Sequence, residues 1–148
     1  MASQPSVLLA CNDCKSRSAL GGILAGFGLE LVFASSVKQA RASLLERPID
    51  LVVCEATLTD GSFRDVLHIL NLAGSRVPLV VCSLLGEIDE YLEAMELGAF
   101  DFIAPPFRPV ELELIVNTVL GKSFSTDHKR AAANPANLGW EKERKAAS

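Results

Sequence analysis

The stretch Ile49-Asp-Leu-Val-Val-Cys54 is followed by Glu55 and then by an Asp60-Gly61 pair. The run is almost wholly apolar, which is typical of a strand buried on both faces of a parallel sheet. Asp60-Gly61 indicates a turn. Apolar residues at helical spacing come next, namely Phe63, Val66, Leu67 and Leu70. This stretch therefore predicts a buried strand followed by an amphipathic helix.

The same alternation of a short apolar run with an amphipathic segment extends over residues 6–120. The other predicted strands are Ser6–Ala10, Glu30–Ala34, Pro78–Cys82 and Phe100–Ile103, and a helix is expected after each. We expect the Asn12-Asp13 pair to cap the first helix. Strands that alternate with helices in this way predict an α/β domain with a parallel sheet.

Charge is distributed unevenly along the chain, whose formal net charge is −4. We expect a short lead over residues 1–5, a folded domain over 6–120 and a basic, flexible tail over 121–148 that contains Trp140. The tail carries six basic and three acidic residues, or +3, which leaves −7 for the remainder. An acidic domain lacks the basic surface expected for direct DNA binding.

The sequence also bears on location and redox state. No apolar run reaches the roughly 18 residues needed to cross a bilayer. Residues 1–5 carry no basic start of a secretory signal. We therefore expect a cytoplasmic protein without membrane contact, whose four cysteines are kept reduced.

A family resemblance rests on Asp50–Glu55, on Val77–Ser83 and above all on Glu96-Leu-Gly-Ala-Phe-Asp-Phe-Ile-Ala-Pro-Pro-Phe107. With the order of elements, these stretches resemble the receiver domain of two-component response regulators, over about residues 5–120. The resemblance implies a flavodoxin-like, doubly wound sheet of strand order 2-1-3-4-5. It also implies a phosphorylatable aspartate at the end of the third strand.

Carried over residue by residue, the resemblance implies a degenerate phosphorylation site. The acidic pair that holds Mg²⁺ falls on Cys11 and Asn12, the phosphoacceptor falls on Glu55, and the lysine falls on Pro105. A thiol and a neutral amide are poor ligands for Mg²⁺. Glu55 is one methylene longer than aspartate, which displaces its carboxylate from in-line geometry. We expect no phosphorylation, weak or absent Mg²⁺ binding and no other cofactor.

Two switch positions of the family are kept, as Ser83 and Phe102. The resemblance thus implies a stand-alone signalling module that is not an enzyme and acts by protein-protein contact. In one version Glu55, near Ser83, imitates the phosphorylated state; in the other it merely fills the site. The expected contact surface combines the helix after Ser83, strand Phe100–Ile103 and the helix that begins at Pro109, and a homodimer is a further expected assembly.

The helix after Ser83 carries a run of carboxylates that we expect to point outward, namely Glu87, Asp89, Glu90, Glu93 and Glu96. Such a face is usually only solvated, and the alternative is a partner site. The loop after strand Phe100–Ile103 offers two candidates for a cis bond, Ala104-Pro105 and Pro105-Pro106.

Two alternative functions stay open. One is a receiver that accepts phosphate through its atypical site. The other is a thiol-redox or soft-metal sensor that uses Cys11 and Cys14, because a helix N-terminus lowers the pKa of a nearby thiol. Cys54 and Cys82 end neighbouring strands and would lie at the same end of the sheet. Against the sensor, free cysteine is commonly a small core residue.

Overall fold

A sheet of five parallel strands, in the order β2-β1-β3-β6-β7, forms the centre of the fold. Strand β1 (Ser6–Ala10) pairs with both β2 (Glu30–Ala34) and β3 (Leu51–Glu55). Strand β6 (Leu79–Cys82) lies between β3 and β7 (Asp101–Ile103). Because β6 and β7 are the fourth and fifth strands of this sheet, the predicted α/β class and the flavodoxin-like order 2-1-3-4-5 are confirmed.

The computed structural model describes residues 4–121. They belong to two parts, which divide between Phe107 and Arg108. In the second part the described element is helix α5 (Pro109–Leu120), which begins at a proline and is closed by Gly121 in the left-handed conformation. The predicted tail beyond Gly121, with Trp140, lies outside the described residues, as do residues 1–3 of the lead. No helix between residues 4 and 121 has the length and apolarity to span a membrane.

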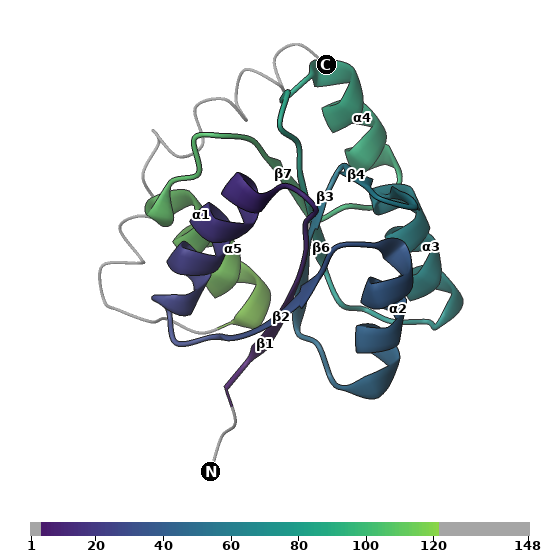
Figure 1. Cartoon of the computed structure of the whole chain (residues 1–148), viewed down its shortest axis with the longest axis horizontal. Coiled ribbons are helices and arrows are strands. Elements are labelled where there is room, and N and C mark those ends of the chain that lie inside the picture. Colours follow the sequence, from purple (N-terminus) through teal and green to yellow (C-terminus); the bar gives the residue numbers. More distant parts are fainter. Residues whose placement is uncertain (1–3, 122–148) are drawn as a thin grey trace. The chain divides into compact units, whose positions relative to one another are not determined.

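Four helices of the first part cover the sheet on both faces. They are α1 (Cys14–Ala25), α2 (Val37–Glu46), α3 (Phe63–Leu72) and α4 (Ile88–Glu96). Helix α1 lies on one face, and α2, α3 and α4 lie on the other (Figure 1). As predicted, Asp13 caps α1: its Oδ2 accepts a hydrogen bond from the Ser16 N–H at 2.9 Å.

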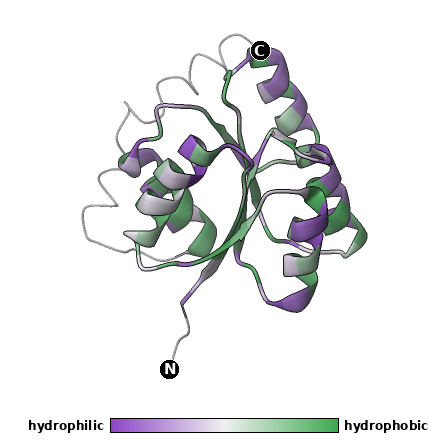
Figure 2. Cartoon of the chain, viewed as in Figure 1, coloured by the Kyte–Doolittle hydropathy of each residue, from purple (hydrophilic) through white to green (hydrophobic). Residues whose placement is uncertain are grey.

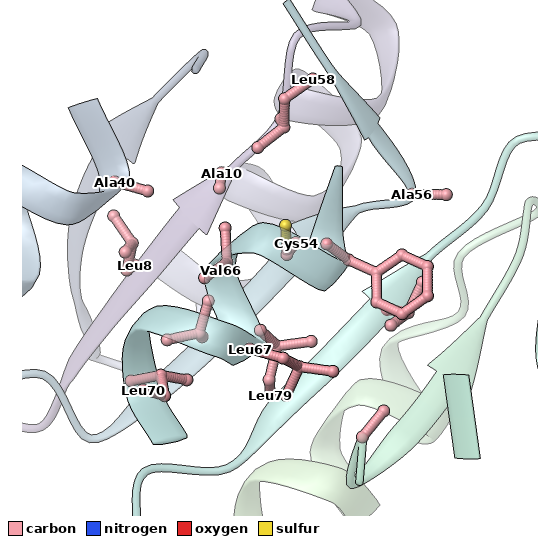
Figure 3. Close-up of a cluster of buried hydrophobic side chains, with 14 of the residues drawn as sticks. Leu8, Ala10, Ala40, Cys54, Ala56, Leu58, Val66, Leu67, Leu70 and Leu79 are labelled. Atoms are coloured by element: carbon pink, nitrogen blue, oxygen red, sulfur yellow. The ribbon is translucent and has the colours of Figure 1, made fainter. Parts of the chain in front are cut away.

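The core follows from the apolar composition of the strands. Every residue of β1 and β3 is buried, and the hydrophobic colour runs through the middle of the sheet in Figure 2. Val66, Leu67 and Leu70 of α3 belong to the buried cluster that also contains Cys54 and Leu79 (Figure 3). Burial of apolar surface of this kind is the main favourable contribution to folding. The polar residues of the site lie at the carboxyl ends of the strands, beyond this apolar core.

A two-stranded hairpin that the sequence did not predict lies between β3 and α3. It consists of β4 (Thr57–Leu58) and β5 (Gly61–Ser62), which pair antiparallel. At its tip, the carboxylate of Asp60 accepts hydrogen bonds from the N–H groups of Val37 at 2.6 Å and Lys38 at 3.2 Å. The hairpin therefore fastens onto the first turn of α2.

Candidate functional site

The carboxyl ends of the strands bring the predicted site residues to one edge of the sheet. Cys11 and Asn12 follow β1, Glu55 ends β3, Ser83 follows β6 and Pro105 follows β7. Loops at this edge form the ligand crevice of open parallel α/β sheets. The predicted placement of the site is thus found, although its residues take partners that the sequence did not reveal.

Glu55 is buried, with 7% of its surface exposed. Its Oε1 accepts hydrogen bonds from the backbone N–H groups of Asn12, at 2.7 Å, and Asp13, at 3.2 Å. Both donors lie immediately before α1, where the positive end of the helix dipole also favours a carboxylate. Hydrogen bonds of an ionised acceptor are stronger than neutral ones. The charge of Glu55 is therefore compensated by backbone amides.

Cys11 is fully buried beside this carboxylate. Burial in the first place, and the negative charge of Glu55 in the second, raise the pKa of its thiol to about 12. The lowered thiol pKa expected for the Cys11-x-x-Cys14 spacing is therefore wrong for Cys11, because desolvation and a like charge oppose thiolate formation. Cys14 is exposed, and it opens α1.

The remaining cysteines behave as core residues. Cys54 and Cys82 are buried free thiols, and burial raises the pKa of both. Within residues 4–121, no group of three or more histidine, cysteine or carboxylate side chains could hold a metal ion. The geometry gives the soft-metal alternative no set of ligands.

The hydroxyl of Ser83 is held by the loop between β6 and α4. It donates a hydrogen bond to the carboxylate of Glu90 and accepts one from the Gly86 N–H at 3.1 Å. The expectation that Glu90 points outward is wrong, because its carboxylate turns back to this buried serine. Among the described residues no hydrogen bond joins Glu55 to Ser83, since the two side chains have different partners.

Phe102, the aromatic switch position, lies inside the protein with 5% of its surface exposed. Its ring meets that of Tyr91 from α4 edge to face, with centroids 5.7 Å apart and planes at 79°. This is a favourable arrangement for two aromatic rings, and it links β7 to α4.

The loop after β7 contains the cis bond expected there, between Pro105 and Pro106. Ala104 in this loop closely approaches Gly86 of the β6–α4 loop. A Cβ atom at Gly86, whose φ is +62°, would lie 3.1 Å from the Cβ of Ala104. Close packing and the left-handed backbone both require glycine there.

Sequence reasoning missed Arg17, which supports the loop after β1. Its Nη2 donates a hydrogen bond to the carbonyl oxygen of Cys11 at 2.7 Å, and its guanidinium lies 5.9 Å from the centroid of the Phe33 ring. The only signal for it was an arginine in the first turn of a predicted helix, which is too common to indicate a role.

The residues present do not fit the Mg²⁺ ion that the family resemblance implies. Mg²⁺ requires hard oxygen ligands in near-octahedral geometry. Cys11 offers a thiol that resists ionisation, and Glu55 directs Oε1 to two backbone N–H groups. Asp13, the remaining nearby carboxylate, caps α1.

Comparison with known sequences agrees with this arrangement of elements. Residues 7–117 match the response regulator receiver domain. The luminescence regulatory protein LuxO of Vibrio campbellii is 31% identical over 130 residues, which are 87% of this chain and 28% of that protein. The response regulator protein PilR of Pseudomonas aeruginosa is 29% identical over 118 residues, or 80% of this chain and 26% of that protein. The chain thus spans less than a third of the length of these relatives.

Comparison with solved structures gives the same fold. The receiver domain of NtrX from Brucella abortus is 27% identical, with a TM-score of 0.71 over 79% of this chain and 99% of that one. The receiver domain of the sensor histidine kinase PA1611 from Pseudomonas aeruginosa has a TM-score of 0.73 over 81% of this chain and 100% of that one. The latter holds a magnesium ion in its active site cleft, and at 18% identity its likeness shows the fold alone.

Proposed function

Because this chain belongs to the response regulator receiver domain family, we propose that it is a cytoplasmic two-component signalling module that is not phosphorylated and acts by protein contact. The observation that carries the proposal is the partner of Glu55. Its carboxylate, at the phosphoacceptor position, accepts hydrogen bonds from Asn12 and Asp13 of the main chain. A nucleophile must present an oxygen in line with the reacting phosphorus, and these bonds orient the Glu55 carboxylate toward the main chain instead.

The surroundings of Glu55 support the proposal. A phosphoryl group needs cationic groups to offset its developing charge, and Pro105 stands at the position where the family has a lysine. The thiol of Cys11 and the amide of Asn12 stand where the family has Mg²⁺-binding carboxylates. We propose that Mg²⁺ binding is weak or absent for this reason and that the module catalyses no reaction of its own.

The contact surface that we propose centres on α4. Leu85, Ile88 and Leu92 expose 79%, 58% and 50% of their surfaces. Ile88 and Leu92 are one helical turn apart and share a face, and the exposed carboxylates of Asp89 and Glu96 lie on the adjoining face. Apolar side chains bordered by carboxylates fit a partner that presents apolar and basic side chains.

Strand β7 adjoins α4 through the contact of Phe102 with Tyr91, and we include it in the proposed surface. The contributions of α5 and of a homodimer stay predictions from the family resemblance. Phosphorylation at an atypical site, the second candidate function, also stays a prediction. The hydrogen bonds that Glu55 accepts from the Asn12 and Asp13 N–H groups argue against it.

The test is incubation with acetyl phosphate and Mg²⁺, followed by intact mass spectrometry. We expect no mass gain in the wild type. The matched control carries Cys11→Asp, Asn12→Asp, Glu55→Asp and Pro105→Lys, which return the acidic pair, the acceptor and the lysine. We expect this variant to gain one labile phosphoryl group only when Mg²⁺ is present. A labile phosphoryl group on the wild type that is absent from Glu55→Gln would overturn the proposal.

A further inference from the structure

Three carboxylates, Glu55, Asp60 and Glu90, each fasten a different loop at the carboxyl edge of the sheet. We propose that these three carboxylates lock the site, so that the α4 face keeps one conformation without a phosphoryl group or Mg²⁺. The inference rests on the proposed function and adds its regulation: the module presents its contact surface constitutively.

The first carboxylate, Glu55, fixes the loop between β1 and α1. Glu55 reaches across from β3 to two consecutive N–H groups of this loop, those of Asn12 and Asp13. Arg17 holds the same loop from the helix side through the carbonyl oxygen of Cys11. The loop is therefore held at three successive residues. The main-chain groups that form these bonds are paired with side chains of the same domain.

The second carboxylate, Asp60, fixes the β4–β5 hairpin against α2. Asp60 accepts from two N–H groups in the first turn of α2, and Thr59 Oγ1 donates to the carbonyl oxygen of Ser35 at 3.3 Å. The approach is close, because a Cβ atom at Gly61 would lie 2.9 Å from a methyl carbon of Val37. The hairpin thus packs closely against the start of α2.

The third carboxylate, Glu90, holds the side chain of the switch residue Ser83. The Ser83 hydroxyl donates to Glu90 of α4 and also accepts from Gly86. To turn toward Glu55, the buried Ser83 hydroxyl would have to give up both its bond to the Glu90 carboxylate and its bond from Gly86, and breaking bonds of a buried polar group is costly. Ser83 consequently holds the start of α4 in place.

A ligand shifts a conformational equilibrium only by its difference in affinity for the two states. A phosphoryl group would find the Glu55 carboxylate bonded to amides, Ser83 bonded to Glu90 and Pro105 in place of a cation. Glu55 and Ser83 thus already have partners in the first state, and the cation that would favour a second state is missing. The population of a second state is therefore small with or without a phosphate analogue.

Hydrogen exchange followed by mass spectrometry tests the lock directly. The wild type is compared with and without beryllium fluoride and Mg²⁺, and then with Glu55→Gln, Glu55→Asp, Asp60→Asn and Glu90→Gln. The matched control is Asp50→Asn, because Asp50 Oδ2 also accepts a backbone N–H, that of Ser6 at 2.8 Å, but at the opposite edge of the sheet. Circular dichroism establishes that each variant is folded.

We expect the analogue to leave exchange in the wild type unchanged. Each variant should exchange roughly tenfold faster in the loop that its carboxylate fastens, as the loss of one charge-assisted hydrogen bond implies. These loops are residues 11–17 for Glu55, 35–40 for Asp60 and 83–91 for Glu90. Asp50→Asn should accelerate exchange near Ser6 and leave the three loops as they are.

Slower hydrogen exchange over residues 83–91 of the wild type in the presence of beryllium fluoride and Mg²⁺ would overturn the lock. Unchanged exchange rates in the corresponding loops of the Glu55 and Glu90 variants would overturn it too. Intact mass after acetyl phosphate separates the two proposals. A phosphorylated wild type would contradict the proposed function, whereas an unmodified wild type whose loops respond to the analogue would contradict only the lock.

Discussion

Cys11 illustrates how the surroundings of a single residue decide its chemistry. It occupies a position where the family has a metal-binding carboxylate, and its spacing to Cys14 is that of a redox pair. In the structure the side chain is buried beside Glu55, and its pKa is raised to about 12. The thiolate is the reactive form of cysteine, so burial and the raised pKa both disfavour reaction of Cys11 at neutral pH.

Alkylation provides the measurement at this scale. At pH 8 we expect iodoacetamide to modify the folded chain once, at the exposed Cys14, and to modify all four cysteines after unfolding in urea. Intact mass gives the number of modifications. Cys14→Ser is the control and should remain unmodified when folded. Rapid modification of folded Cys14→Ser would contradict the burial of Cys11.

Residue-scale prediction from sequence succeeded where the partner is local. The Asn12-Asp13 pair was expected to cap the first helix, and Asp13 does so. Glu55 bonds residues more than 40 positions earlier in the chain, and Ser83 bonds a carboxylate that periodicity placed outward. Such choices depend on side-chain rotamers and on loop paths, which hydrophobic patterning does not encode.

At the scale of elements, the β4–β5 hairpin is the unexpected feature. The five strands of the sheet were predicted because each is a short, mostly apolar run followed by a segment of helical period. Strands β4 and β5 contain two residues each, which is too short for any period to be visible. The Asp60-Gly61 turn was predicted from its composition, but its bonds to α2 were not.

The hairpin makes Gly61 sensitive to substitution. We expect Gly61→Ala to lower the melting temperature, because the added Cβ would meet the Asp65 carboxylate and a Val37 methyl carbon. Gly22→Ala in α1 is the matched control, since nothing lies within 4 Å of its Cβ. It should gain about 0.5–1 kcal/mol from helix propensity. Thermal unfolding followed by circular dichroism compares the two, and equal shifts would contradict the packing of the hairpin.

For the molecule as a whole, carboxylates link stability to acid pH. Hydrogen bonds from backbone N–H groups, those of Ser16 and Val37 first, lower the pKa values of Asp13 and Asp60 below 3.8. The bond from Arg64 lowers the pKa of Glu93 below 4.5. In each case the unfolded chain takes up the proton first as the pH falls. Their contribution is therefore complete above these values and is lost as the pH falls through the folded-state pKa values.

Urea unfolding between pH 3 and pH 7 measures this dependence. We expect the free energy of unfolding of the wild type to change little between pH 6 and 7 and to fall below about pH 4.5. The triple variant Asp13→Asn, Asp60→Asn, Glu93→Gln should be less stable at pH 7 and should show a flatter dependence at acid pH. Parallel curves for the two proteins would contradict the assignment of these three groups.

The bond between Glu55 and the amides of Asn12 and Asp13 also bears on how this site can evolve. A single exchange of Glu55 for aspartate removes a support of the loop and returns neither the ligands of a metal nor a lysine. Exchange of Cys11 or Asn12 alone for aspartate places a new negative charge beside Glu55. Each of these three exchanges thus removes a support or adds a like charge without returning the activity, so at these positions the site would behave as an evolutionary ratchet.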